Sequence, residues 1–192
     1  RSAYDHRGIP GISKVAIVTG ASRGLGQLIV SNLKDAGYQV FGCSTHSTPG
    51  VDVSDRWQVF RFVDDVLRET GRIDVLVNNA GVIYPNTPLL ENTMDEDLFD
   101  CLQTHVRGPF LMMKKVIPVM RKQNSGVIVN IASKSAVYAV PGLAAYSASK
   151  AALVALTQAA AKELGETNVL CVVVCPAGMN TWAREKAYGR ED

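Results

Sequence analysis

The sequence predicts a single doubly wound α/β domain, and three observations lead to this prediction. Short runs that are apolar at every position alternate along the chain with segments of helical periodicity. Such runs are typical of parallel strands whose sheet is covered by helices on both faces. The first apolar run is followed directly by a cluster of glycines. The 192 residues, of which 47% are hydrophobic and 20% charged, suit one globular domain.

The strands are expected where apolar and β-branched residues run between turn residues. They are placed at residues 14–20, 38–43, 73–81, 126–133 and 168–174, with a short additional strand at Val51–Val53. In a parallel sheet of this kind a ligand lies beyond the carboxyl ends of the strands. The residues that end these runs are therefore the candidates for function.

The first two helices are expected to follow the first strands. One covers residues 24–36, and the next begins at a cap formed by Ser54. The apolar face of this second helix is predicted to consist of Trp57, Phe60, Val63 and Leu67.

Two further helices are expected at residues 93–120 and 146–164. Thr93 and Glu96 match the T-x-x-E pattern of a capping box, which predicts where the earlier of the two begins. Pro118 is expected to end or kink that helix, because proline cannot donate a backbone hydrogen bond.

Charge and composition exclude several kinds of partner. The 20 basic and 18 acidic residues leave a net charge of +2, which gives no basic surface of the kind that nucleic-acid binding uses. No apolar run is long enough to span a membrane, and the first residues lack the apolar core of a signal peptide. We therefore expect a cytoplasmic protein with neither nucleic acid nor a membrane as a partner.

The four cysteines are too few and too scattered for a disulfide framework, and the three histidines form no metal-binding pattern with them. No metal site is expected. Residues 1–13 are interpreted as an N-terminal extension, and residues 14–192 as the domain itself.

The glycine cluster after the first strand is a candidate nucleotide site. Glycines let the backbone turn tightly and approach a pyrophosphate, while the next helix offers free N–H groups and the positive end of its dipole. A strand before the cluster and a helix after it favour this interpretation over an ordinary glycine turn. The predicted contacts are Gly20, Ser22, Arg23, Gly24, Leu25 and Gly26.

Two further groups of residues suggest chemistry at the strand ends. Asn78–Gly81 ends a strand with small residues against which a ribose or nicotinamide could lie, although Asn and Gly also favour ordinary turns. Tyr146 and Lys150 are four residues apart, so they share one face of a predicted helix. A nearby ammonium lowers the pKa of a phenol, which is otherwise about 10. Ser133 ends the preceding strand and is either a hydrogen-bond donor to a substrate oxygen or a turn residue.

In this order and spacing the motifs resemble those of the short-chain dehydrogenase/reductase family. The matching segments are TGASRGLG at 19–26, NNAG at 78–81, Ser133, YSASK at 146–150 and CPAGMNT at 175–181. The resemblance begins at Lys14 and covers nearly the whole chain. The chain is similar to carrier-protein oxoacyl reductases and to sugar, steroid and polyol dehydrogenases. This resemblance implies a Rossmann-like sheet.

The resemblance also implies roles for individual residues. Tyr146 is expected to act as the general acid–base and Ser133 to polarise the substrate carbonyl. Lys150 is expected to hold the nicotinamide ribose and to lower the pKa of Tyr146. Contacts to the dinucleotide are implied for Asn79, Ala80 and Gly81, for Asp52 and Val53 at the adenine, and for Met179 and Thr181 at the carboxamide.

The preferred cofactor is expected to be NADP(H). NAD-binding members of this architecture place an acidic residue about 20 residues beyond the glycines, where it binds the ribose 2′-hydroxyl. Here Ser44 and Thr45 occupy that place, and no carboxylate lies between Val40 and Val51. Arg23 in the glycine turn could reach a 2′-phosphate, or it could be a solvated loop cation. NAD(H) is the alternative.

The chain departs from the family pattern in three places. His105 stands where the family often has Asn, Ala177 follows Pro176 where it has Gly, and the connection from Cys43 to Asp52 is too short for the usual helix. We keep two interpretations of His105. It is a helix histidine bonded locally, or it replaces Asn in a water-mediated proton relay from Lys150, which would add an ionisation near neutral pH.

We therefore expect an NAD(P)-dependent oxidoreductase that interconverts a small-molecule carbonyl and a secondary alcohol. A sensor or scaffold that binds the cofactor with little turnover is the alternative from another class, and a related epimerase or dehydratase is a third. The substrate is expected to meet mostly apolar walls at Val82–Leu90, Ala136–Leu143 and Trp182–Tyr188, which do not identify it. The resemblance also implies a homodimer or homotetramer assembled through the helices at 93–120 and 146–164.

The end of the chain carries one more expectation. The resemblance implies a substrate-covering helical segment and a seventh strand after residues 168–174, whereas only Thr181–Asp192 remain for them. We expect these 192 residues to be part of a longer polypeptide, apparently lacking the C-terminal strand. A short form whose sheet edge is covered by a partner subunit is the alternative.

Overall fold

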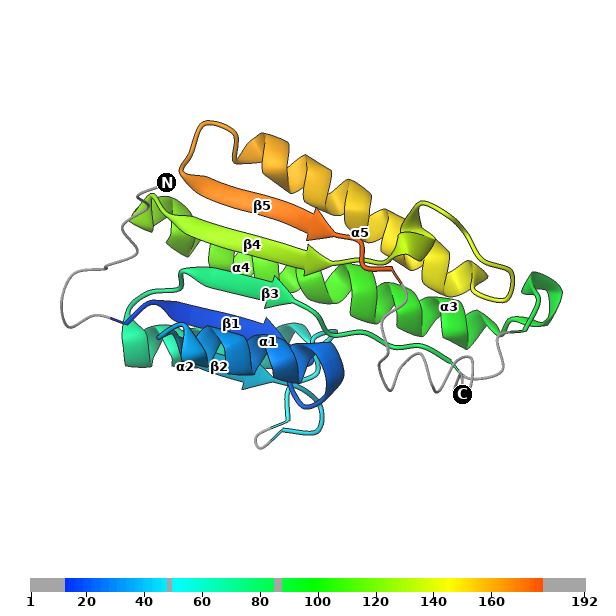
Figure 1. Ribbon diagram of the computed structural model, residues 1–192, viewed down its shortest axis with the longest axis horizontal. Helices are drawn as coiled ribbons and strands as arrows, with labels where there is room; N and C mark the ends of the chain where they lie inside the picture. The colour runs from blue at the N-terminus through cyan, green and yellow to red at the C-terminus, as the bar shows by residue number, and fades with distance from the viewer. Residues whose placement is uncertain (1–12, 48–49, 85–87, 178–192) are drawn as a thin grey trace.

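The computed structural model describes residues 13–47, 50–84 and 88–177. Five parallel strands form one sheet in the order β2-β1-β3-β4-β5 (Figure 1). The strands are β1 (Val15–Thr19), β2 (Gln39–Cys43), β3 (Val75–Asn78), β4 (Gly126–Ile131) and β5 (Val169–Val174). The strand order reverses at β1, so the crevice between the loops that follow β1 and β3 is where a ligand is expected.

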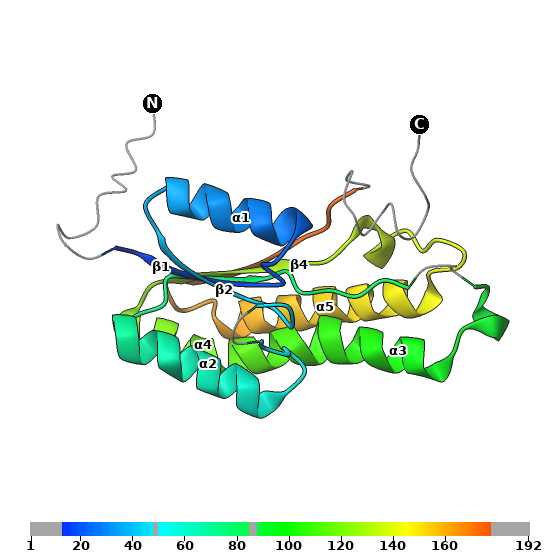
Figure 2. The ribbon, with the colours of Figure 1, turned by 90° about the horizontal axis from the view of Figure 1, so that it is seen from below.

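Helices cover both faces of this sheet, which confirms the doubly wound α/β prediction. Figure 2 shows α1 on one face and the remaining helices on the other. The helices are α1 (Gly24–Asp35), α2 (Arg56–Thr70), α3 (Asp95–Leu102), α4 (Gly108–Gln123) and α5 (Ala144–Glu163). The main core lies between the sheet and the α2–α4–α5 layer, where Ile17, Leu76 and Ile128 are fully buried with Val63 and Met112.

The predicted strand at Val51–Val53 is wrong. Both valines are buried, but the backbone turns instead of pairing with β2. The Asp52 carboxylate accepts hydrogen bonds from the Ser54 N–H and hydroxyl, each 2.8 Å long, and this local bonding competes with an extended conformation. Between Cys43 and Arg56 the described residues contain no helix, as the short connection predicts.

The second helix was placed correctly, but its cap was not, and one of the four residues of its predicted apolar face is exposed. Asp55, not Ser54, is the N-cap, and its carboxylate accepts the N–H groups of Trp57 and Gln58. Trp57 is 80% exposed. Val63 is buried as predicted, and Phe60 and Leu67 are partly buried against the core. The other buried positions of α2 are Val59 and Val66.

The single helix predicted for residues 93–120 is three consecutive segments. These are α3, a π-helical turn at Gln103–Arg107, and α4. The Thr93–Glu96 capping box does not form, because the Thr93 hydroxyl donates to the Leu89 carbonyl and α3 begins after Met94. Pro118 lies inside α4, which continues to Gln123.

Three of the four cysteines are buried, and Cys175 is exposed just beyond β5. Within the described residues β5 pairs only with β4, and its Leu170 and Val174 side chains are exposed. No helix in the described part of the chain has the length and apolarity to cross a membrane.

Candidate active site

The glycine turn after β1 folds tightly against the start of α1. Gly20 and Gly24 have φ angles of 65° and 54°, a region that residues with a Cβ rarely adopt. A Cβ at Gly26 would fall on the Gly20 carbonyl oxygen, so this position also requires glycine. Because α1 begins at Gly24, its first N–H groups lie at the turn, where an anion would be stabilised.

Asn79 fastens the loop after β3 to this glycine turn. The Thr19 hydroxyl oxygen accepts the backbone N–H groups of Asn79 and Ala80, each at 3.0 Å. The Asn79 side-chain amide nitrogen donates to the carbonyl oxygens of Thr19 and Gly20, at 3.0 and 3.1 Å. The N–H groups of this side chain therefore stabilise the glycine turn, and Asn79 holds the two sides of the crevice between β1 and β3 together.

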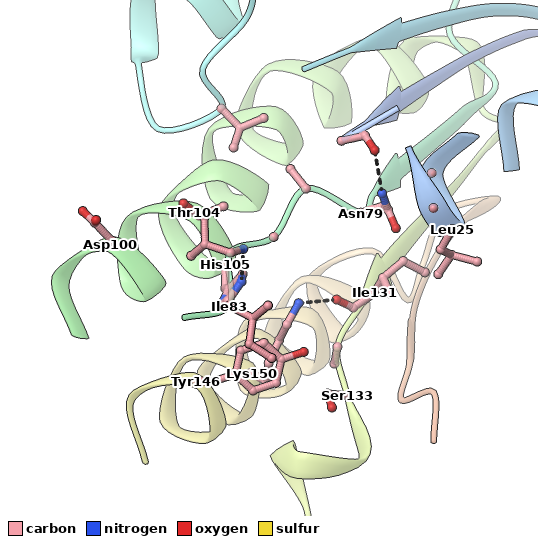
Figure 3. A pocket seen from close by; sticks show the side chains of 18 of the residues that line it. Leu25, Asn79, Ile83, Asp100, Thr104, His105, Ile131, Ser133, Tyr146 and Lys150 are labelled. Atoms are coloured by element: carbon pink, nitrogen blue, oxygen red, sulfur yellow. Dashed lines mark hydrogen bonds between the residues drawn. The ribbon is translucent and has the colours of Figure 1, made fainter. Parts of the chain in front are cut away.

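Tyr146 and Lys150 lie one turn apart on α5, as their spacing predicts, and Figure 3 shows them side by side. The Lys150 Nζ donates to the Ile131 carbonyl at 2.8 Å and lies 5.7 Å from the centre of the Tyr146 ring. Lys150 is buried, and this desolvation lowers its pKa to about 8.

Ser133 faces Tyr146 from the end of β4 (Figure 3). It is the N-cap of a short 3₁₀ turn, Lys134–Ala136, where its Oγ accepts the Ser135 N–H at 3.2 Å. Since that oxygen already accepts a hydrogen bond from the backbone, its hydroxyl proton can be donated into the cavity.

His105 occupies the π-helical turn and is fully buried. Its Nε2 accepts the Val82 N–H at 3.0 Å, and its Nδ1 lies 2.8 Å from the Ser149 Oγ. Its ring meets the Tyr146 ring edge-on, with the centroids 5.3 Å apart. Burial and the charge of Lys150 hold the pKa of His105 well below its usual value, so the structure does not support the added ionisation near neutral pH.

One continuous cavity of about 1200 Å³ connects all these groups. Every predicted site residue that the structure describes lines it. At the dinucleotide end these are Gly20, Ser22, Arg23, Gly24, Leu25, Gly26, Ser44, Thr45, Asp52, Val53, Asn79, Ala80 and Gly81. At the other end they are His105, Ser133, Tyr146 and Lys150. Met179 and Thr181, expected at the carboxamide, lie outside the described residues.

Sequence reasoning missed a row of lining residues on the α3 side of the cavity. They follow a helical spacing of three and four, which is the signal that could have found them: Asp100, Gln103, Thr104 and Arg107. The Tyr84 hydroxyl donates to the Asp100 carboxylate at 2.7 Å. Burial and this carboxylate raise the pKa of Tyr84, which keeps it a neutral hydrogen-bond donor at the cavity wall.

The sequence comparisons agree with this geometry. A family model described as short chain dehydrogenase matches residues 14–192. The 3-oxoacyl-[acyl-carrier-protein] reductase FabG of Staphylococcus aureus is 34% identical in an alignment 184 positions long, which covers 86% of this chain and 74% of the relative. The 2-(R)-hydroxypropyl-CoM dehydrogenase of Xanthobacter autotrophicus is 34% identical in an alignment 190 positions long, which covers 88% of this chain and 76% of that protein.

Solved structures agree as well. A 3-ketoacyl-(acyl-carrier-protein) reductase from Brucella melitensis, complexed with NADH, has a TM-score of 0.87 and 28% identity, and the match covers 92% of this chain and 81% of that one. ElxO with NADP bound has a TM-score of 0.86 and 27% identity, with coverages of 91% and 77%. Family match, relatives and fold are consistent with one another: the chain belongs to the short-chain dehydrogenase family of oxidoreductases.

Proposed function

We propose that the chain interconverts a small-molecule carbonyl and a secondary alcohol with a nicotinamide dinucleotide, using Tyr146, Lys150 and Ser133. The observation that carries this proposal is that these three side chains line the same cavity as the glycine turn. The turn lies at the switch point of the sheet, where dinucleotides bind in folds of this kind.

The residues present fit a dinucleotide. Gly20, Gly24 and Gly26 keep the crevice free of side chains, and the Gly26 position has no room for a Cβ. The first turn of α1 would hold the pyrophosphate, Asp52 and Val53 the adenine end, and Lys150 the nicotinamide ribose. When bound, the dinucleotide supplies or accepts the hydride.

The protein moves the proton that accompanies the hydride. Tyr146 donates its hydroxyl proton to the substrate oxygen in reduction and recovers a proton from it in oxidation. The Lys150 ammonium, close to the Tyr146 ring, favours the phenolate that remains after donation. Ser133 donates a hydrogen bond to the same substrate oxygen and stabilises the charge that develops there.

We propose NADP(H) as the preferred dinucleotide, with NAD(H) as the alternative. Arg23, Ser44 and Thr45 line the end of the cavity that would receive the ribose 2′-position, and the residues there include no carboxylate between Val40 and Val51. A phosphate is favoured by a guanidinium and by hydroxyl donors, whereas a free 2′-hydroxyl is usually held by an acid. Of the similar structures, one binds NADP and another NADH, so the family accommodates both.

We further propose a homo-oligomer built on α3 and α4, which carry exposed apolar side chains at Leu98, Leu102 and Phe110. The substrate class proposed is a carbonyl compound of moderate size, since Ile83, Val140 and Leu143 give the cavity apolar walls. A cytoplasmic location stays a prediction from the sequence.

A turnover screen with ketones and secondary alcohols, run with both dinucleotides, tests the proposed function. Tyr146→Phe is expected to lower kcat by roughly 100-fold or more, because the general acid–base is lost. Dinucleotide affinity, measured by fluorescence titration, is expected to stay close to that of the wild type, because the glycine turn and Lys150 are intact. A kcat near the wild-type value would exclude Tyr146 as the proton donor.

A further inference from the structure

His105 lies where three segments of the chain meet. It belongs to the π-helical turn between α3 and α4, it contacts the loop after β3 through Val82, and it contacts α5 through Ser149. The same α5 turn carries Tyr146, whose ring packs edge-on against the imidazole. Figure 3 shows His105 close to Tyr146 and Lys150, and all three line the cavity.

The hydrogen bonds around His105 fix the direction of every donor. The Val82 N–H can only donate, so the Nε2 must accept and carries no proton. The neutral ring then has its proton on Nδ1, which donates to the Ser149 Oγ. The Ser149 hydroxyl donates in turn to the Tyr146 carbonyl at 2.7 Å. A single ordered chain therefore runs from Val82 through His105 and Ser149 to Tyr146.

We propose that His105 is a positioning residue that, together with Ser149, ties the α5 turn bearing Tyr146 to the loop bearing Gly81 and Val82. Tyr146 and Gly81 line the cavity where substrate and nicotinamide are proposed to meet. The geometry of proton transfer depends on their relative placement, to within fractions of an ångström. This role rests on the proposed function of Tyr146 and differs from the proton-relay interpretation, because His105 does not change its protonation state.

The surroundings of His105 favour the neutral ring. The titratable groups that act on it directly are Lys150 and Tyr146 on α5. Cys101 on α3, whose thiol has its pKa raised to about 11 by burial, interacts with Ser149. An imidazolium would face the ammonium of Lys150 and would direct an N–H from Nε2 against the N–H of Val82. Both contacts would be repulsive, which is consistent with the lowered pKa of His105.

Two substitutions separate the two halves of this connection. His105→Asn places an amide nitrogen near the position of Nδ1 and keeps a donor for Ser149, but it is too short to reach Val82. His105→Gln places its carbonyl oxygen near the position of Nε2 and keeps the acceptor for Val82, but it loses the donor to Ser149. Ser149→Ala removes the contact to α5 from the other side. Thr70→Val is the matched control, since the Thr70 hydroxyl makes a similar bond to the Val66 carbonyl on α2, far from the cavity.

Amide hydrogen exchange and NMR test the connection without turnover. In His105→Asn the Val82 amide is expected to exchange roughly tenfold faster, the effect of one lost buried hydrogen bond. In His105→Gln that amide is expected to stay protected, while the amides of residues 146–150 exchange faster. Long-range ¹H–¹⁵N spectra of the wild type are expected to show the Nδ1–H tautomer from about pH 5.5 to about pH 8.5. An imidazolium or an Nε2–H tautomer in that range would overturn the assignment.

Kinetics then tests the positioning role. We expect His105→Gln and Ser149→Ala to lower kcat by about tenfold with little change in KM or in dinucleotide affinity, and to leave the inflections of the pH–rate profile in place. Thr70→Val is expected to match the wild type. A shifted or missing inflection in His105→Gln would support a relay and refute positioning alone. Unchanged kcat in both variants would also refute it. If the wild type turns over no carbonyl, the proposed function fails, and the exchange and NMR results still decide whether the connection exists.

Discussion

Lys150 is an amine enclosed by protein, and its burial costs folding free energy. Burial lowers its pKa to about 8 from the ordinary 10.5 of a lysine, so the folded protein holds this proton more weakly than the unfolded chain does. The difference of about 2.5 pKa units corresponds to about 3 kcal/mol at neutral pH. This loss of stability occurs at a position where an ammonium next to Tyr146 would stabilise the phenolate in the proposed reaction.

The sign of this effect gives a test. Between pH 8 and 10.5 the unfolded chain binds more protons at Lys150 than the folded protein does, so the contribution of Lys150 to stability rises with pH across that window. Below pH 8 both states are protonated and the penalty is constant. Relative to Lys150→Met, the wild type without dinucleotide is therefore expected to gain about 3 kcal/mol in unfolding free energy across the window.

Urea unfolding at a series of pH values measures this difference. Lys162→Met, an exposed lysine exchanged on the same helix, is the control and is expected to keep the wild-type pH dependence. Parallel curves for the wild type and Lys150→Met would show that Lys150 keeps an ordinary pKa in the folded state.

Arg23 gives a second test at a single residue. If its guanidinium binds a 2′-phosphate, Arg23→Leu is expected to lower kcat/KM with NADPH by roughly tenfold or more, the typical effect of losing one charge-assisted hydrogen bond. The value with NADH is expected to change little. A wild type that prefers NADH by tenfold, or an equal loss with both dinucleotides, would contradict the role of Arg23.

At this scale the sequence predicts which side chains share the cavity, but not how they bond to one another. Tyr146 and Lys150 follow from helical spacing and Ser133 from a strand end. Asn78 and Asn79 look alike in the sequence, yet Asn78 turns into the core and bonds Asn130, while Asn79 turns to the glycine turn. The side on which each one lies depends on where β3 ends, which the pattern fixes only to within a few residues.

Among the elements, strands were predicted more reliably than helix ends. Apolar β-branched runs mark β1, β3, β4 and β5. This signal is strongest at β1 and β3, which are buried along nearly their whole length, whereas β5 keeps exposed side chains at Leu170 and Val174. The break between α3 and α4 has no such signal. The π-helical turn at Gln103–Arg107 adds a residue to one helical turn and points His105 inward, and tertiary contacts to Val82 and Ser149 stabilise it there.

A comparison of Gly26, at the junction between β1 and α1, with Gly71, at the end of α2, gives a prediction at the level of elements. Gly26→Ala is expected to weaken dinucleotide binding by at least about tenfold and to destabilise the fold by roughly 1–3 kcal/mol, because its Cβ would overlap the Gly20 carbonyl and Asn79. Gly71→Ala places a Cβ in open space at the left-handed C-cap of α2, so it costs only backbone strain, about 1 kcal/mol, and leaves binding unchanged. Fluorescence titration and thermal unfolding of both variants measure the contrast. Equal binding by the two would show that the turn tolerates a side chain.

For the molecule as a whole, the sequence predicted layers and parallel strands correctly because alternation of strand and helix leaves few other arrangements. It did not predict which surfaces stay uncovered. On α3, Leu98 and Leu102 are 42% and 38% exposed and lie one turn apart, and on α4 Phe110 is 46% exposed. Large apolar side chains exposed close together on one helix are typical of an interface between proteins.

We therefore expect the chain to form dimers or larger homo-oligomers through Leu98 and Leu102. Light scattering after gel filtration is expected to give the wild type a mass of at least twice the 20.7 kDa of one chain. The double substitution Leu98→Lys and Leu102→Lys is expected to shift it to the monomer mass, because two buried ammonium groups facing their copies would repel. Leu28→Lys changes a leucine on α1 that is even more exposed, on the opposite face of the sheet, and is expected to leave the mass unchanged. Circular dichroism confirms that each variant is folded. A monomeric wild type, or a double variant with the wild-type mass, would place the interface elsewhere or remove it.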